Sequence, residues 1–299
     1  MTGLSEILER LAAELGPVQG EPVALDGGIT NRNYRVRFGE RECVVRLPGR
    51  DTELLVIDRA AERIANAAAA RLGIAPALIA ADEHRLVTEY LPGAPIDGDR
   101  LRATPDSAAH ALRAFHDSGT QLPVRFWVPE LLERYADTVR ERGGALPDVY
   151  PEVQALVARV AAALPLTDPV PCHDDLLPGN LLARDDEPGR AMLVDWEYAG
   201  MGHRLFDLGN LAVNNDFDAA AEERLLTAYF GEPPDRRRTA ALQLFKLVSD
   251  AREGAWGVVQ RAISELDFDF DDYAAKHFAR LLKAASDHRL QEHLDAATA

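Results

Sequence analysis

The spacing of apolar residues changes near residue 91, and this change constrains the fold more than any other feature of the chain. Before it, the runs Asn33–Phe38 and Glu42–Leu47 alternate apolar and polar residues, which is the period of a strand with one buried face. After Leu91-Pro-Gly93, apolar residues recur with the 3.6-residue period of helices. The sequence therefore predicts an α+β fold of two lobes. A small antiparallel β lobe covers residues 1–91, a larger and mostly helical lobe covers 92–299, and 91–93 forms a short hinge.

Each lobe also contains elements of the other type. In the first lobe a helix is expected over Leu4–Leu15 and another over Arg59–Leu72, where Gly73 ends it. The remaining strands expected there are Pro22–Leu25, Ala77–Ala81 and Leu86–Tyr90. In the second lobe, two short strands are expected at Leu181–Ala183 and Met192–Val194. Its expected helices are Ser107–Ser118, Glu130–Arg142, Pro151–Leu164, Asp207–Asn214, Ala219–Phe230, Arg238–Ile263 and Tyr273–Ala296.

The charge balance narrows the class of partner. The 299 residues include 33 Lys and Arg against 49 Asp and Glu, a formal net charge of −16. Nucleic-acid binding needs a basic face to displace counterions, so we expect no nucleic-acid partner, whereas a cationic small molecule suits this charge. We find no signal-peptide core and no apolar run long enough for a membrane span, so we expect a cytoplasmic protein without a membrane partner. The oligomeric state cannot be read from the sequence.

Two polar motifs carry the strongest chemical signal. The first is His173-Asp-Asp-Leu-Leu-Pro-Gly-Asn180, and the second, Leu193-Val-Asp-Trp-Glu197, follows an apolar run. Phosphoryl transfer from ATP needs a carboxylate to orient and deprotonate the acceptor, together with oxygen ligands for Mg²⁺. Asp175 can supply that carboxylate, and Asn180 and Asp195 can supply an amide oxygen and a second carboxylate to the metal. The alternative is a polar loop of turns and caps, but the combined motifs favour Mg²⁺-dependent phosphoryl transfer.

At these motifs the chain resembles the aminoglycoside phosphotransferase/choline kinase superfamily, relatives of the protein kinases, and most of all its bacterial choline and ethanolamine kinases. The resemblance extends from Gly27 to about Arg280. Besides the two motifs above, it rests on Gly27-Gly-Ile-Thr-Asn31, Val44-Val-Arg-Leu-Pro-Gly49, Glu89-Tyr-Leu-Pro-Gly93, Val194-Asp-Trp-Glu-Tyr-Ala-Gly200 and Arg204-Leu-Phe-Asp-Leu-Gly-Asn210. It implies a bilobal protein-kinase-like fold and a small-molecule kinase that uses ATP and Mg²⁺.

The resemblance also implies roles for individual residues. Asp175 would be the catalytic base, and Asn180 and Asp195 would bind Mg²⁺. His173 is expected to shape the loop, and His116 to be a core or capping residue. The residues that would contact ATP are Gly28, Thr30 and Asn31 in a loop over the phosphates, Arg46 on the α- and β-phosphates, Glu62 as the partner of Arg46, and Tyr90 and Leu91 beside the adenine. Glu53 remains an alternative partner for Arg46.

The acceptor pocket departs from the family pattern. Trp256 and Tyr273 match two aromatic positions of the choline site, but Glu253 stands where the family has another tryptophan. A carboxylate replaces a cation–π contact by a salt bridge, which favours an amine that can donate N–H. Trp256 and Tyr273 would equally suit a hydrophobic core. Glu197 is expected to face the substrate ammonium or the metal, and Asp175 the acceptor hydroxyl.

These observations together predict an ATP- and Mg²⁺-dependent kinase for the hydroxyl of choline or a related amino alcohol such as ethanolamine. A kinase for another cationic alcohol, such as thiamine or an aminoglycoside, is the first alternative. A nucleotide-binding pseudokinase is a more remote one, because the base and both metal ligands are present.

Overall fold

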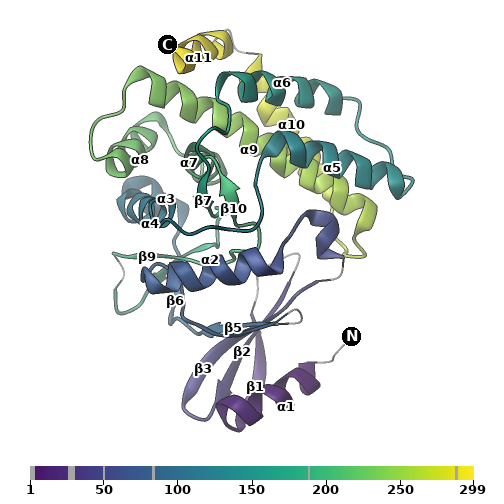
Figure 1. Ribbon diagram of the computed structural model, residues 1–299, viewed down its shortest axis with the longest axis vertical. Coiled ribbons are helices and arrows are strands. Elements are labelled where there is room, and N and C mark those ends of the chain that lie inside the picture. Colours follow the sequence, from purple (N-terminus) through teal and green to yellow (C-terminus); the bar gives the residue numbers. More distant parts are fainter. Residues whose placement is uncertain (1–3, 26–30, 50, 83–84, 188, 287–288) are drawn as a thin grey trace.

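The computed structural model describes residues 4–25, 31–49, 51–82, 85–187, 189–286 and 289–299. It has the two predicted lobes, with the β-rich lobe at the bottom of Figure 1 and the helical lobe above it. The predicted α+β architecture is confirmed.

The first lobe is built on a five-stranded antiparallel sheet with strand order β1-β2-β3-β5-β4. Its alternating sequences bury one face: Val36 and Phe38 from β2, with Cys43 and Val45 from β3, pack against the helix α1 (Leu4–Leu15). The strands are β1 (Val18–Leu25), β2 (Arg32–Phe38), β3 (Arg41–Leu47), β4 (Leu78–Ala81) and β5 (Leu86–Glu89).

Helix α2 (Arg59–Arg71) lies between the sheet and the helical lobe (Figure 1). Asp58 caps it, because its side chain accepts hydrogen bonds from the N–H groups of Ala60 and Ala61. The alanine-rich face of α2, including Ala65 and Ala69, belongs to the hydrophobic core of the second lobe. This packing places the polar end of α2, with Arg59 and Glu62, beside the second lobe.

A long central helix, α9 (Arg236–Ile263), organises the helical lobe. It is buried almost throughout from Ala240 to Gln260 and is surrounded by other helices of the lobe. Gly209 allows the close approach of α7 to α9, since a Cβ there would lie 2.8 Å from the backbone of Phe245. The helices that pack on α9 are α5 (Val128–Glu141), α6 (Tyr150–Ala163), α7 (Arg204–Asn214), α8 (Ala219–Phe230), α10 (Phe270–Ala285) and α11 (Arg289–Thr298). The lobe also contains α3 (Gly98–Ala103) and α4 (Asp106–His116), and α4 packs on α7 and α8.

Two small sheets of the second lobe support the polar motifs. One contains β6 (Gly93–Pro95), β8 (Leu181–Arg184) and β9 (Ala191–Leu193), and the other pairs β7 (Val170–Cys172) with β10 (Gly200–Gly202). At Gly93, φ is +157°, and a Cβ would lie 2.1 Å from the carbonyl oxygen of Ala183. The hinge therefore requires glycine at this position.

Some sequence-based elements were wrong in extent. The single helix expected over Tyr273–Ala296 is two helices, because α10 ends at Ala285 and α11 begins at Arg289. Ser286 caps α10, and its hydroxyl donates to the carbonyl of Lys283, one of the last carbonyls that a helix end leaves without an intrahelical partner. Strand β1 begins at Val18 rather than Pro22. The elements that the sequence did not indicate are β6, β7, β10, α3 and the 3₁₀ turn Thr52–Leu55.

None of the helices in the described ranges is both long enough and apolar enough to span a membrane.

Candidate active site

A cavity of about 580 Å³ lies between the two lobes. Strands β2, β3 and β5 and the hinge line one side, and the motifs at 175–182 and 194–198, together with α9, line the other. The predicted site residues that line this cavity are Asn31, Arg46, Tyr90, Leu91, Asp175, Asn180, Asp195, Glu197, Glu253, Trp256 and Tyr273. Gly28 and Thr30 lie outside the described residues. The structure therefore brings the residues of both motifs to one place.

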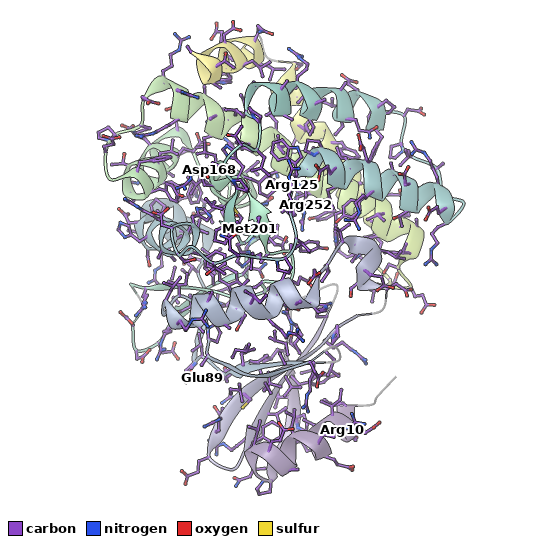
Figure 2. All side chains as sticks on the ribbon, viewed as in Figure 1. Arg10, Glu89, Arg125, Asp168, Met201 and Arg252 are labelled. Atoms are coloured by element: carbon purple, nitrogen blue, oxygen red, sulfur yellow. The ribbon has the colours of Figure 1, made fainter. Side chains whose placement is uncertain are left out.

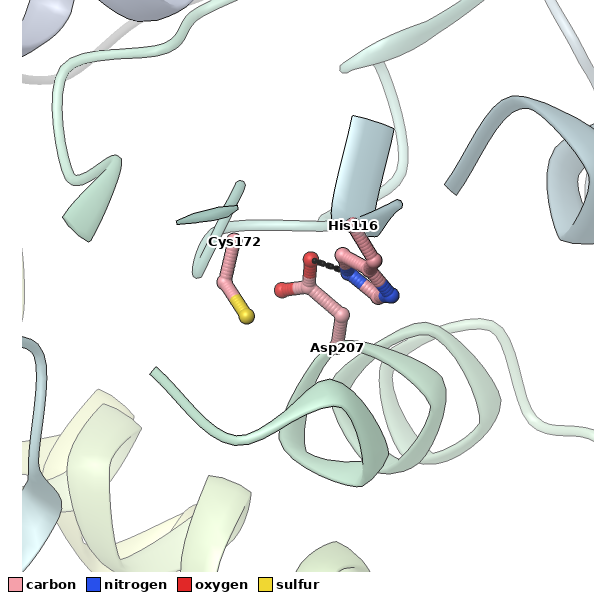
Figure 3. Close-up of side chains that lie close together, drawn as sticks. All are labelled: His116, Cys172 and Asp207. Carbon is pink, nitrogen blue, oxygen red and sulfur yellow. Dashed lines mark hydrogen bonds and ion pairs between the residues drawn. The ribbon is translucent and has the colours of Figure 1, made fainter. Parts of the chain in front are cut away.

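The loop that carries Asp175 is held by a buried carboxylate on α7. Asp207 accepts hydrogen bonds from the backbone N–H groups of His173 and Asp174, each at 2.8 Å, and its Oδ2 lies 2.9 Å from His116 Nε2 (Figure 3). Burial alone would raise the pKa of Asp207, but the hydrogen bond and charge of His116 bring that pKa below its ordinary value. Asp207 is therefore ionised, and its carboxylate fixes the backbone of the loop.

His116, Cys172 and Asp207 lie close enough together to suggest a metal site (Figure 3). The hydrogen bonds already described occupy both oxygens of Asp207. Both ring nitrogens of His116 also have partners, since Nε2 contacts Asp207 and Nδ1 lies 2.6 Å from the Tyr229 hydroxyl. We therefore assign this cluster to support of the loop.

His173 fixes the side of the loop that faces strand β9. Its Nε2 lies 2.9 Å from the carbonyl oxygen of Val194, and its Nδ1 accepts the N–H of Asp175 at 3.3 Å. Burial lowers the pKa of His173, and one donor nitrogen with one acceptor nitrogen fits a neutral ring. These contacts join the two sequence motifs, as expected for a residue that shapes the loop.

Asp175 is buried and held from two sides. Its Oδ1 lies 3.0 Å from Arg252 Nη1, and its Oδ2 accepts a hydrogen bond of 3.3 Å from the side-chain amide of Asn180. The same amide donates to the backbone carbonyl of Asp175 at 2.8 Å. Burial raises the pKa of Asp175 well above its ordinary value, and the charge of Arg252 opposes this rise. The amide N–H groups of Asn180 face Asp175, so its carbonyl oxygen remains available as a ligand.

Asp195 and Asn180 form an oxygen donor set that fits Mg²⁺. Asp195 is at the end of the apolar strand β9, with φ at +65°, and its carboxylate lines the same cavity as the amide of Asn180. One carboxylate and one amide oxygen, with room for water and phosphate oxygens, are the ligands that Mg²⁺ prefers. These two residues would hold the ion.

Arg46 on β3 is paired with carboxylates of both lobes at the cavity. Its guanidinium forms ion pairs with Glu62 on α2 and with Asp195. Glu62 also accepts a hydrogen bond of 2.8 Å from Arg59. Of the two glutamates left open by the sequence, the structure therefore places Glu62 against Arg46.

Glu197 links the lobes rather than presenting a free carboxylate. Its Oε2 accepts a hydrogen bond of 2.8 Å from the Asn31 amide and lies 3.3 Å from Arg59 Nη1. Burial raises the pKa of Glu197, and the negative charge of Asp195 raises it further. Both partners of Glu197 belong to the first lobe.

The far end of the cavity contains the aromatic residues and Glu253. Glu253 is 1% exposed and lies between Arg252 Nη1 at 2.8 Å and the Tyr273 hydroxyl, which donates to it at 2.8 Å. Trp256 donates from Nε1 to the Tyr198 hydroxyl at 2.8 Å. Arg252 and Tyr198 were not among the residues predicted from the sequence. The available signals were a charged residue next to Glu253 and a tyrosine next to Glu197.

Asp174 is expected to destabilise the folded protein at neutral pH. It is fully buried, and among the described residues its carboxylate makes no side-chain hydrogen bond, although the backbone of Gly200 lies near enough to act on it. Burial, with the charge of Asp207, raises its pKa well above the ordinary value. The folded state then binds a proton that the unfolded chain releases above about pH 4, so stability falls as pH rises past that value.

Asp174→Asn keeps the shape of the neutral acid and removes this pH dependence. We expect the variant to be more stable than wild type at pH 8 by about 1–3 kcal/mol, with the difference shrinking as the pH approaches 4. Thermal unfolding of both proteins at pH 5 and pH 8 measures it. A stability difference that does not change with pH would contradict the proposed burial of a neutral acid.

Comparisons with known proteins agree with this geometry. Residues 22–242 match the model of the phosphotransferase enzyme family. The chain is 29% identical to ethanolamine kinase 2 of Rattus norvegicus over 95% of its own length and 81% of that protein.

Two solved structures share the whole fold. A choline/ethanolamine kinase family protein of Mesorhizobium loti is 30% identical, with a TM-score of 0.82 and 98% of each chain covered. The choline kinase LicA of Streptococcus pneumoniae is 25% identical, with a TM-score of 0.80, and the alignment covers 94% of this chain and 98% of LicA. The family matches the one inferred from the motifs. The chain therefore belongs to the phosphotransferase enzyme family, in its choline/ethanolamine kinase branch.

Proposed function

We propose that the protein transfers the γ-phosphoryl group of ATP to the hydroxyl of a small amino alcohol of the ethanolamine type. The observation that carries this proposal is the convergence of Asp175, Asn180 and Asp195 on one cavity, with Arg46 beside them. Because ATP is the phosphoryl donor, we further propose that the protein acts in the cytoplasm.

The residues of the cavity divide the chemistry between them. Asp175 orients the acceptor hydroxyl and accepts its proton as the hydroxyl oxygen bonds to the γ-phosphorus and the bond to ADP breaks. Arg46 contacts the donor phosphates through its planar guanidinium. Mg²⁺, when held by Asn180 and Asp195, offsets the charge that develops on the phosphates. Positioning and electrostatics then account for the reaction without a covalent enzyme intermediate.

The acceptor end of the cavity is suited to one positive charge. Two acidic side chains, Asp175 and Glu253, share a single cation, Arg252, so acidic groups outnumber basic ones where a cationic acceptor would bind. The aromatic rings of this pocket already contact other side chains of the protein. Arg252 Cζ lies 4.2 Å from the centroid of the Tyr198 ring, and Trp256 packs edge-to-face against Tyr273 at 5.4 Å.

A quaternary ammonium is held best by several free aromatic faces, whereas a primary amine can donate N–H to a carboxylate. The pocket therefore favours ethanolamine over choline. The names of the rat ethanolamine kinase and the pneumococcal choline kinase support an acceptor within this group.

An acceptor panel tests the proposed function. We expect Mg·ATP consumption to be stimulated most by ethanolamine, with kcat/KM about tenfold or more above that for choline, and least by thiamine and aminoglycosides. Preference for thiamine or an aminoglycoside would contradict the proposed acceptor. Binding of Mg·ATP with no turnover on any acceptor would favour a pseudokinase.

The variant Glu253→Gln tests the acceptor pocket within the same panel. Loss of the carboxylate removes a charge-assisted hydrogen bond, so KM for ethanolamine should rise by about 10- to 100-fold, and KM for choline by less. Glu223→Gln, on the exposed surface of α8, is the matched control and should leave both values unchanged. Equal effects on the two acceptors would remove Glu253 from amine recognition.

A further inference from the structure

Arg252 is a fully buried cation in the middle of the helical lobe (Figure 2). It projects from α9, and only 1% of its surface is exposed. A guanidinium at this depth is costly to desolvate unless charged partners surround it. Its partners therefore indicate what it does.

The contacts of Arg252 converge on the proposed base. A single nitrogen, Nη1, lies 3.0 Å from Asp175 Oδ1 and 2.8 Å from Glu253 Oε1. The guanidinium lies over the Tyr198 ring, and this cation–π contact helps to hold it in place. Within the described part of the chain, Arg252 is the only cation in ion-pair contact with Asp175. Arg46, the other guanidinium at the cavity, pairs instead with Glu62 and Asp195.

Both oxygens of Asp175 are therefore held by fixed groups. Arg252 contacts Oδ1 from α9, and the Asn180 amide contacts Oδ2 from the loop. Two contacts from different elements fix the plane of the carboxylate, and each oxygen retains a lone pair for an acceptor hydroxyl. Without Arg252, the 3.3 Å hydrogen bond from the Asn180 amide would be the one remaining side-chain contact of the Asp175 carboxylate among the described residues.

Glu253 does not by itself account for the position of Arg252. Its second oxygen already accepts the hydrogen bond from the Tyr273 hydroxyl at 2.8 Å. A cation present only to balance Glu253 would have no need to approach Asp175 as well. The geometry points to a role at the reacting end of the cavity.

We propose that Arg252 is a positioning residue, which holds the Asp175 carboxylate in the orientation that accepts the proton of the acceptor hydroxyl. This assignment rests on the proposed role of Asp175 as the base. It adds a residue on α9 to the groups that set the rate of transfer.

The experiment compares three variants of the full chain. Arg252→Met removes the cation. Arg252→Met combined with Glu253→Gln removes the cation together with one carboxylate, so the local formal charge returns to its wild-type value. Arg280→Met is the control, because Arg280 pairs with the buried Asp250, which lies on α9 two residues before Arg252. Each is assayed for kcat, for KM of ATP and of ethanolamine, and for Tm.

We expect Arg252→Met to lower kcat by about 10²-fold or more, since small displacements of a reacting group have effects of this size, while KM for ATP changes little. The double variant should regain thermal stability but keep the low kcat, with its KM for ethanolamine raised. Arg280→Met should lose stability and retain kcat.

Recovery of kcat in the double variant would overturn the proposal, because Arg252 would then serve only to balance Glu253. A fall in kcat of similar size in Arg280→Met would also overturn it, because any disturbance of α9 would suffice. Turnover of the wild-type protein on the acceptor panel tests the proposed function separately, whereas the ratios between these variants test Arg252.

Discussion

Replacing Asp175 by asparagine is expected to lower kcat by about 10³-fold, which is within the range that general-base catalysis contributes. The amide has nearly the shape of the carboxylate, and its carbonyl oxygen can still accept a hydrogen bond from Arg252 Nη1. What the variant loses is the group that accepts the proton of the acceptor hydroxyl. The measurement is kcat at saturating Mg·ATP and acceptor.

The Asp175→Asn variant should bind Mg·ATP almost as the wild-type protein does, because the groups assigned to the nucleotide and metal are untouched. Calorimetric titration with Mg·ATP in the absence of acceptor measures this. Asp186→Asn, an exposed carboxylate between β8 and β9, is the matched control and should keep full turnover. Near-normal turnover in Asp175→Asn would refute its role as the base.

Helices and strands were predictable where apolar residues recur at a regular spacing over several helical turns or along a whole strand. Strands β2 and β3 contain the runs Asn33–Phe38 and Glu42–Leu47 that were predicted as strands, and helices such as α8 match the predicted bounds. Strands β7 and β10 have three residues each and form only because they pair with one another across a long stretch of chain. Three residues show no period, so no local pattern could have indicated them.

The boundary between α10 and α11 shows a second limit. Apolar residues continue with helical spacing across Tyr273–Ala296, and nothing in that spacing marks a stop. Ser286 caps the last turn of α10, and its hydroxyl bonds to the carbonyl of Lys283, a contact that depends on local geometry.

The proposed catalytic and metal residues were predictable because each occurs within a short motif of characteristic residue types. Arg252 was not, because its partner Asp175 is 77 positions earlier in the chain and on another element. The sequence shows an arginine among other charged residues of a helix but does not show which carboxylate it faces. For Glu197, the position two residues after Asp195 predicted a contact with substrate or metal. Its contacts with Asn31 and Arg59 of the other lobe could not be predicted, because these residues are far away in the sequence.

Asp195→Ala is expected to abolish turnover in a different way from Asp175→Asn. Its carboxylate is one of the two proposed Mg²⁺ ligands, and it also pairs with Arg46. Removing it should lower kcat by about 10³-fold or more, since the electrostatic effect of a bound metal is worth several kcal/mol. The loss should extend to binding, so the affinity for ATP should no longer increase when Mg²⁺ is added.

Titration with ATP in the presence and absence of Mg²⁺ separates the two variants. Asp175→Asn should retain the Mg²⁺-dependent gain in ATP affinity, Asp195→Ala should lose it, and the exposed control Asp186→Ala should retain both the gain and turnover. If Asp195→Ala kept the gain, the metal would be held elsewhere. The ion pair with Arg46 would then be the reason for the position of Asp195 in the cavity, because that pair bridges the two lobes without any metal. The dependence of ATP affinity on Mg²⁺ thus decides between a metal ligand and a link between lobes.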